Sequence, residues 1–282
     1  MSSEVFSFNV VDRDFGQGPM KLVSEENFRI ELTNLGDISD LQADLLRIAA
    51  AVFFADRLVV RKRGWARNIL LSVEVRHREF WTQEEIQENL LQIVGDILGG
   101  ESWEFNFYEG PQRPRQSTII SAPRGAGTRV CLYSGGLDSA AGLAIRLRNS
   151  TSISFVPVTV RHNPRIPQLL HRQFSRIGRD FRRVQPAISI KVALIAPPRF
   201  KNQEHSQRCR SFLFTVCGGV AAQVIGDGVV ELYESGVGAI NLPLQQGAGS
   251  RATRGCHPRV LAQVEELFLK VTGRSVVFQL PF

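Results

Sequence analysis

The chain has 282 residues, of which 43% are hydrophobic and 22% charged, and its 34 Lys and Arg residues outnumber its 27 Asp and Glu residues to give a net charge of +7. No run approaches the ~20 apolar residues that a membrane-spanning helix needs. The N-terminal residues also lack the basic and apolar regions of a signal peptide. These features predict a cytoplasmic protein without a membrane partner, long enough for two domains.

Arginine dominates the basic residues, with 29 Arg against five Lys. A guanidinium group binds phosphate and carboxylate through paired hydrogen bonds, so this bias suits a nucleotide binder and permits nucleic acid without requiring it. The four cysteines form no CxxC pair, which favours free thiols over disulfides or a four-thiolate zinc site. They are Cys131, Cys209, Cys217 and Cys256.

The first 110 residues predict a small α+β domain of unknown role. Asp37 or Ser39 is expected to cap a helix through residues 40–55. Thr82 and Glu85 fit a capping box that opens a second helix over residues 82–100. The expected strands lie at the end of residues 21–34 and at residues 56–61, 68–76 and 102–110. A Pro-, Gly- and Arg-rich stretch, residues 111–128, then predicts a linker.

The second half, residues 129–282, alternates buried strands with helices. Continuous apolar runs rich in Val and Ile, separated by helices, predict an α/β domain whose parallel sheet is covered on both faces. The expected strands are residues 129–133, 152–160, 187–196 and 229–234. The expected helices are residues 138–149, 166–184 and 209–226.

The sequence SGGLDS, residues 134–139, lies between the first of these strands and its helix. Two glycines let the backbone approach a ligand, and free N–H groups at a helix start favour an anion. Ser134 and Ser139 add hydroxyl donors. Asp138 by itself would repel a phosphate, so it fits best beside a Mg²⁺ ion that bridges phosphate oxygens. The loop predicts a site for magnesium-complexed phosphate, and an ordinary strand–helix turn is the alternative.

SGGLDS after a strand resembles the PP-loop of the N-type ATP pyrophosphatases. The resemblance implies an adenine nucleotide α-hydrolase-like (HUP/PP-loop) domain over residues 129–282. Its pyrophosphate cradle would be Ser134, Gly135, Gly136, Leu137, Asp138 and Ser139. Three further stretches make this half most similar to 7-cyano-7-deazaguanine synthase (QueC) and to QueC-like proteins of bacterial phage-defence clusters. They are RSFLF (210–214), ELYESGVGAINLPL (231–244) and RATRGCHP (251–258).

The resemblance implies an ATP-dependent ligase that splits ATP into AMP and pyrophosphate with Mg²⁺. It would activate a carboxylate or amide of a 7-deazaguanine-type substrate for a nitrogen nucleophile, with antiviral defence as one setting. Asp138 and Ser139 would be catalytic, and Asp138 would hold the Mg²⁺. The family also carries Zn²⁺ on four cysteines near its C-terminus, and the cysteines here form no such cluster. Either the chain lacks that zinc segment or its activity differs.

Polar residues follow other strands of the predicted parallel sheet. Arg161 and His162 follow the second strand, Glu234 and Asn241 follow the fourth, and Arg210 opens a helix. Because the carboxyl ends of parallel strands share one edge of the sheet, we expect these residues to border the same cleft. They are candidates to contact a small-molecule or base-like acceptor. An exposed loop histidine and a structural ion pair for Arg210 are the alternatives.

Four arginines recur at helical spacing over residues 172–183, opposite the apolar positions of the same segment. This stripe could bind RNA, an acidic protein or a second subunit, and a solvated charged face is the alternative. Its members are Arg172, Arg176, Arg179 and Arg183. Two other functions stay open at this point: a tRNA-modifying enzyme of the same superfamily, and a non-catalytic nucleotide-binding module.

Overall fold

The computed structural model describes most of the chain. The described residues are 5–12, 21–24, 28–33, 38–60, 67–98, 101–110, 127–161, 166–181, 183–194, 204, 207–234, 236 and 255–282. Within these ranges, no helix has the length and apolar character required to cross a bilayer.

The described strands form one mixed sheet of ten strands, in the order β10-β9-β6-β7-β8-β3-β2-β1-β4-β5. Their bounds are β1 Val5–Asp12, β2 Lys21–Ser24, β3 Phe28–Thr33, β4 Asn68–Val75, β5 Ser102–Glu109, β6 Thr128–Leu132, β7 Ser154–Arg161, β8 Ile188–Leu194, β9 Val229–Leu232 and β10 Val277–Gln279. The described helices are α1 Asp40–Leu58, α2 Arg78–Trp81, α3 Glu84–Leu98, α4 Leu137–Asn149, α5 Ile166–Asp180, α6 Arg210–Ile225 and α8 Pro258–Thr272.

Strands β10, β9, β6, β7 and β8 pair in parallel. The chain runs outward from β6 through β7 to β8 and then returns through α6 to β9 and β10 on the other side of β6. The strand order therefore reverses between β6 and β9. Such a reversal opens a crevice outside the carboxyl ends of the two strands, which is where open α/β sheets bind ligands. The prediction of an α/β architecture with a parallel sheet is confirmed.

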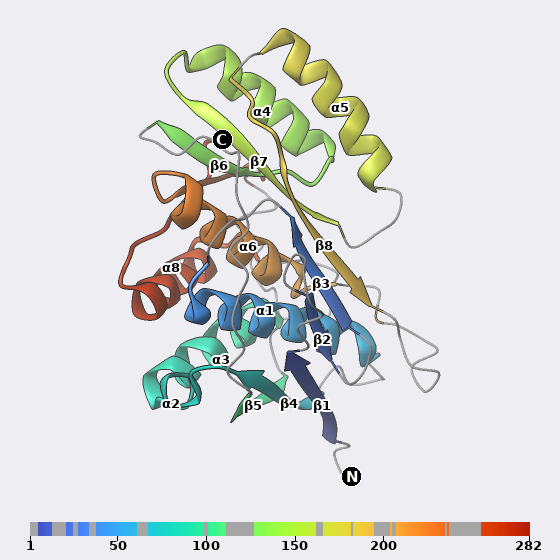
Figure 1. The fold of residues 1–282 in the computed structure, drawn as a ribbon, viewed down its shortest axis with the longest axis vertical. Helices are drawn as coiled ribbons and strands as arrows, with labels where there is room; N and C mark the ends of the chain where they lie inside the picture. Colours follow the sequence, from blue (N-terminus) through green and yellow to red (C-terminus); the bar gives the residue numbers. More distant parts are fainter. Residues whose placement is uncertain are drawn as a thin grey trace.

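Helices cover this parallel block on both faces, as Figure 1 shows, with α4 and α5 on one side and α6, α8 and α1 grouped on the other. One apolar cluster under α4 and α5 includes Cys131, Leu143 and Phe155. A larger cluster on the opposite face includes residues of α1, α3, α6 and α8. Apolar burial on both faces explains why the strand sequences read as continuous Val- and Ile-rich runs.

The N-terminal half shares the sheet and the larger core with the second half. Strand β3 pairs antiparallel with β8, and helix α1 packs against α6 and α8. The residues of α1, α6 and α8 belong to one continuous cluster of buried side chains. Most of the proposed linker, residues 111–126, lies outside the described residues, so the boundary there stays a prediction.

Three local predictions in the N-terminal half have different outcomes. Ser39 caps α1 in a capping box with Gln42, as one of the two alternatives predicted. Thr82 was expected to open the next helix, but α3 begins at Glu84 and the Thr82 hydroxyl donates to carbonyls of the preceding helix α2. The prediction of a strand at residues 56–61 is also wrong for residues 56–60, the part that the structure describes, because α1 continues through Leu58.

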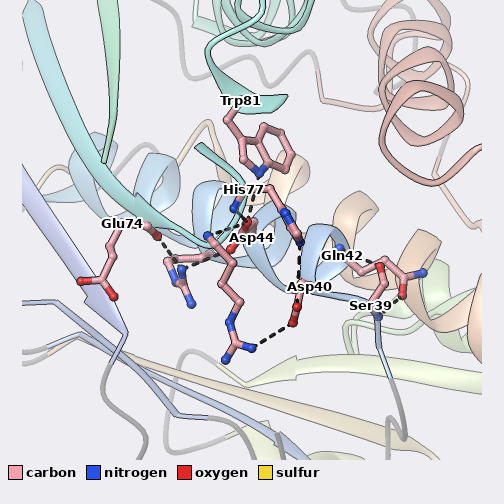
Figure 2. A network of polar contacts seen from close by, with 9 residues as sticks. Ser39, Asp40, Gln42, Asp44, Glu74, His77 and Trp81 are labelled. Atoms are coloured by element: carbon pink, nitrogen blue, oxygen red, sulfur yellow. Dashed lines mark hydrogen bonds and ion pairs between the residues drawn. The ribbon is translucent and has the colours of Figure 1, made fainter. Parts of the chain in front are cut away.

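A buried carboxylate fixes the chain where it leaves β4 (Figure 2). Asp44 on α1 is fully buried, and its Oδ2 accepts from the main-chain N–H groups of Arg76 at 2.9 Å and His77 at 3.3 Å. The same oxygen accepts from the indole N–H of Trp81 at 3.2 Å, while Oδ1 pairs with Arg47 at 3.2 Å. Burial raises the pKa of Asp44, and Arg47 and these N–H groups oppose that rise. This carboxylate thus joins α1, β4 and α2.

We expect Asp44→Ala to lower the free energy of unfolding by about 3–5 kcal/mol, because a buried pair loses one member while its other donors lose their shared acceptor. Equilibrium unfolding in urea measures the change. Glu88→Ala, which removes an exposed carboxylate from α3, is the matched control and should change the free energy by less than about 0.5 kcal/mol. Similar midpoints for both variants would show that the Asp44 contacts contribute little.

Candidate functional site

The loop from β6 to α4 carries the SGGLDS motif. Gly136 is the N-cap of α4, with φ −74° and ψ 170°, and it supplies no capping side chain. The Ser134 hydroxyl oxygen accepts from the N–H of Gly136 at 3.2 Å, and the Ser139 hydroxyl donates to the Gly136 carbonyl at 2.9 Å. The two hydroxyl oxygens lie 3.3 Å apart. Two hydroxyls therefore lie together at the start of a helix, where an oxyanion could replace their internal hydrogen bonds.

Gly135 cannot be replaced by another residue without strain. Its φ is +82°, a left-handed conformation that costs other residues roughly 1–2 kcal/mol. A Cβ atom there would also lie 3.2 Å from a methyl group of Leu170 and 3.3 Å from one of Leu169 on α5. The loop therefore passes close beneath α5, and the glycine in the motif has a physical reason at this position.

A cavity of about 160 Å³ opens at the carboxyl ends of β6 and β9, where the strand order reverses. Four residues singled out in the sequence line it together: Ser134, Ser139, Arg210 and Glu234. Six further lining residues lie in the stretches that resemble QueC: Ser211, Phe214, Leu232, Tyr233, Gly255 and Cys256. The sequence did not point to the remaining four, which are Leu132, Gln207, Arg208 and Thr215. A cavity of about 150 Å³ holds one benzene-sized ring, so a whole nucleotide would extend beyond this one.

The wall opposite the motif loop combines a cation, a carboxylate and a thiol. Burial lowers the pKa of Arg210, while the nearby Cys256 and Glu234 act to raise it. The guanidinium lies 5.7 Å from the centre of the Phe214 ring. Burial, and then Glu234, raise the pKa of Cys256 to about 12, so its thiol stays protonated at neutral pH and is a poor nucleophile. This wall can bind polar groups, and it offers no activated cysteine.

Gln207 is the cavity residue with the least ordinary geometry. Its φ is 46°, a left-handed conformation for a residue other than glycine. Its side-chain oxygen is buried and has no hydrogen-bond partner among the described residues. Both features are costly and occur preferentially at binding sites, where a ligand can supply the missing donor. No periodicity or motif in the sequence marks this residue, which precedes α6 in an irregular segment.

A buried ion cluster is linked to the cavity through Tyr233, which lines it. Glu231 on β9 is fully buried and accepts two hydrogen bonds from Arg146 of α4, at 2.8 and 2.9 Å. It also accepts from Arg129 at 3.0 Å and from the Tyr233 hydroxyl at 3.1 Å. The Tyr233 ring in turn packs so closely on Gly142 of α4 that a Cβ there would lie 2.4 Å from the ring. This cluster fastens α4 to the strand at the other side of the crevice.

The structure does not place the other predicted site residues in the cavity. Asp138 and Leu137 are exposed in the first turn of α4, where Leu137 keeps 83% of its surface, and neither lines the cavity. Arg161 ends β7 at the same edge of the sheet, but its side chain lies outside the described part of the structure. His162 and Asn241 also lie outside the described residues.

The arginine stripe has three members on the surface rather than four. Arg172, Arg176 and Arg179 are exposed on α5. Arg183 instead turns inward and donates to the main-chain carbonyls of Ile153, at 3.4 Å, and Leu147. Arg183 therefore ties the end of α5 to α4, so the prediction that it belongs to an exposed stripe is wrong.

The described side chains bear differently on the two expected metals, Zn²⁺ and Mg²⁺. Over the described residues, no three His, Cys, Asp or Glu side chains gather as ligands for one metal ion, so the donor set of the family's zinc site is not found there. Mg²⁺ differs because it commonly uses one or two carboxylates together with substrate phosphates. Asp138, exposed beside the loop, suits that smaller requirement.

Comparison with known proteins identifies no family: no family model matches the sequence, and no curated protein or solved structure matches the chain. The function therefore has to be inferred from the site and from the resemblance of its motif.

Proposed function

We propose that the chain is an ATP-dependent adenylating enzyme of the PP-loop type with a HUP-like second half. The observation that carries the proposal is the meeting of the SGGLDS loop with Arg210 and Glu234 in one cavity at the reversal of strand order. A strand order that reverses beside a loop with free helix N–H groups is the arrangement used for phosphate binding in open α/β sheets. Residues distant in sequence, Arg210 and Glu234, line the same cavity and could bind the acceptor.

The proposed reaction has two steps. A carboxylate or amide oxygen of the acceptor attacks the α-phosphorus of ATP, a new P–O bond forms, and the bond to the β-phosphate breaks to release pyrophosphate. A nitrogen nucleophile, for which ammonia is the simplest choice, then attacks the activated carbon and displaces AMP, losing a proton. Both steps depend on positioning and on neutralising phosphate charge, so no nucleophilic side chain is needed.

The residues of the site have distinct roles in this proposal. Ser134, Ser139 and the N–H groups of the loop would bind the departing pyrophosphate, and Asp138 would hold Mg²⁺ against it. Arg210 would bind an anionic oxygen of the acceptor, whereas Glu234 and the Gln207 oxygen would accept its N–H groups. A ring-sized cavity with these groups suits a planar heterocyclic acid, and the motif resemblance favours a 7-deazaguanine-type carboxylate.

A second candidate is a tRNA-modifying enzyme of the same superfamily. Its support is the exposed face of α5, where Arg172, Arg176 and Arg179 lie on the helix that contacts the motif loop. Arginines on one helix face can bind a phosphate backbone. The reaction at the loop would be unchanged, and the acceptor would be a base within RNA.

The test is product analysis with ATP, Mg²⁺ and ammonium. We expect AMP and pyrophosphate in equal amounts when a heterocyclic carboxylate is present, and no ADP, because the bond broken lies between the α- and β-phosphates. Replacing the carboxylate by tRNA in parallel reactions separates the two candidates. Release of ADP and phosphate, or no ATP cleavage with any acceptor, would contradict the proposed chemistry and favour a nucleotide-binding module.

A further inference from the structure

The side chain of Gln173 connects α5 to the motif loop. Its amide nitrogen donates to the carbonyl oxygen of Gly135 at 3.0 Å, and its amide oxygen accepts from the Tyr133 hydroxyl at 3.0 Å. Tyr133 is almost fully buried, and its ring lies 4.9 Å from that of Phe174, so the hydroxyl is held in place. A hydroxyl that donates to the amide oxygen leaves the amide nitrogen to face Gly135. The orientation of the Gln173 amide is therefore set at both of its ends.

This contact determines the direction of one peptide plane in the loop. In a trans peptide, the carbonyl and the following N–H point in opposite directions. Holding the Gly135 carbonyl toward α5 therefore turns the N–H of Gly136 away from α5. That N–H donates at 3.2 Å to the hydroxyl oxygen of Ser134, a residue that lines the cavity. The donor thus faces the side of the loop where a phosphate would bind.

Local sequence alone does not fix this direction. Gly135 has φ +82°, and a glycine can rotate its peptide planes with little steric cost. A loop with two adjacent glycines has several accessible orientations, and a ligand that needs one of them would bind more weakly to the mixture. An outside contact is needed to select a single orientation, and Gln173 supplies one.

We infer that Gln173 is a positioning residue that holds the Gly135–Gly136 peptide with its N–H directed toward a bound phosphate. The inference rests on the proposed function, because that N–H would exchange its bond to the Ser134 hydroxyl for one to an oxygen of the pyrophosphate. Tyr133 acts through Gln173 by fixing the amide. Neither side chain touches the ligand, so their loss should weaken phosphate binding without changing the acceptor wall.

The test is the affinity for inorganic pyrophosphate in the presence of Mg²⁺, measured by isothermal titration calorimetry. We expect Gln173→Met to bind about tenfold more weakly, the effect of losing one well-placed hydrogen bond. Gln173→Glu has the same length but no N–H to donate, and should lose at least as much. Gln168→Met, the same substitution on the exposed surface of α5, is the matched control and should bind like the wild type.

A double-mutant cycle separates positioning from general stability. Tyr133→Phe alone should weaken pyrophosphate binding about threefold, and it should have no further effect in the Gln173→Met background, because both act through one hydrogen-bond chain. Should Gln173→Met melt far below the wild type, Tyr133→Phe and Gln173→Glu decide the question. Wild-type affinity in the Gln173 variants would overturn this inference alone. A wild-type protein that binds no pyrophosphate would overturn the proposed function and this inference with it.

Discussion

Asp138→Ala is expected to slow the formation of AMP by about 100-fold or more while leaving the melting temperature nearly unchanged. Asp138 is exposed in the first turn of α4 and does not line the cavity, so its removal disturbs little packing. A carboxylate at a helix N-terminus contributes only about 0.3–1 kcal/mol to stability. Asp138 would hold a Mg²⁺ ion, and that ion would supply charge neutralisation for the leaving pyrophosphate.

The measurement is the initial rate of AMP release at saturating ATP, together with a thermal melt. Asp180→Ala removes an equally exposed carboxylate from the far end of α5, and it should leave both quantities unchanged. If Asp138→Ala turned over at the wild-type rate, Asp138 would have no part in catalysis, and its place in the motif would reflect only its favourable interaction with the N-terminus of α4.

Glu231→Gln should give one of the largest losses of stability in the described part of the chain, about 3–5 kcal/mol at pH 7. The substitution keeps the shape of the side chain but leaves Arg129 and Arg146 facing a neutral amide instead of a carboxylate. Because Arg146 belongs to α4, loss of its ion pair with residue 231 should also weaken the attachment of the helix that begins at the motif loop. Equilibrium unfolding measures the first effect, and pyrophosphate affinity measures the second.

The Glu231 carboxylate should also make the free energy of unfolding depend on pH. Burial by itself raises the pKa of Glu231, but hydrogen bonds from Arg146 and Arg129 outweigh it and lower the pKa below its ordinary value of 4.5. An acid whose pKa is lowered in the folded state stabilises the fold above its ordinary pKa, and that stabilisation is lost as the pH falls through the lowered value. The advantage of the wild type over Glu231→Gln should therefore be complete at pH 7 and shrink below pH 4.5. An equal difference at pH 7 and pH 3 would contradict this.

The second half of the fold was largely predictable because its signals are local. Strands buried on both faces leave continuous apolar runs, and the SGGLDS loop lies where β6 ends and α4 begins, as predicted. The cap of α1 was predicted to within two candidates, Asp37 and Ser39, for the same reason, although the equally local capping box predicted at Thr82 is wrong. These features depend on neighbouring residues and need no knowledge of the rest of the structure.

The features of the fold and of the site that were not predicted depend on contacts between residues distant in sequence. The antiparallel pairing of β3 with β8 joins two halves that the sequence suggested were separate units, and pairing partners leave no local pattern. Val59 and Val60 have high strand propensity, yet α1 runs through the preceding residues because its buried face packs on the sheet and α6. Gln207 and Gln173 could not be picked out from the sequence, because only the fold places Gln207 in the cavity and Gln173 against the loop.

The most direct test of the central claim, that the loop at residues 134–139 holds the pyrophosphate of a cleaved ATP, is a titration of inorganic pyrophosphate with Mg²⁺ into wild-type protein and Ser139→Ala. We expect saturable binding by the wild type that competes with ATP, and at least tenfold weaker binding by the variant, because Ser139 is a buried residue that lines the cavity. Equal affinity in the two proteins, or no competition with ATP, would contradict it.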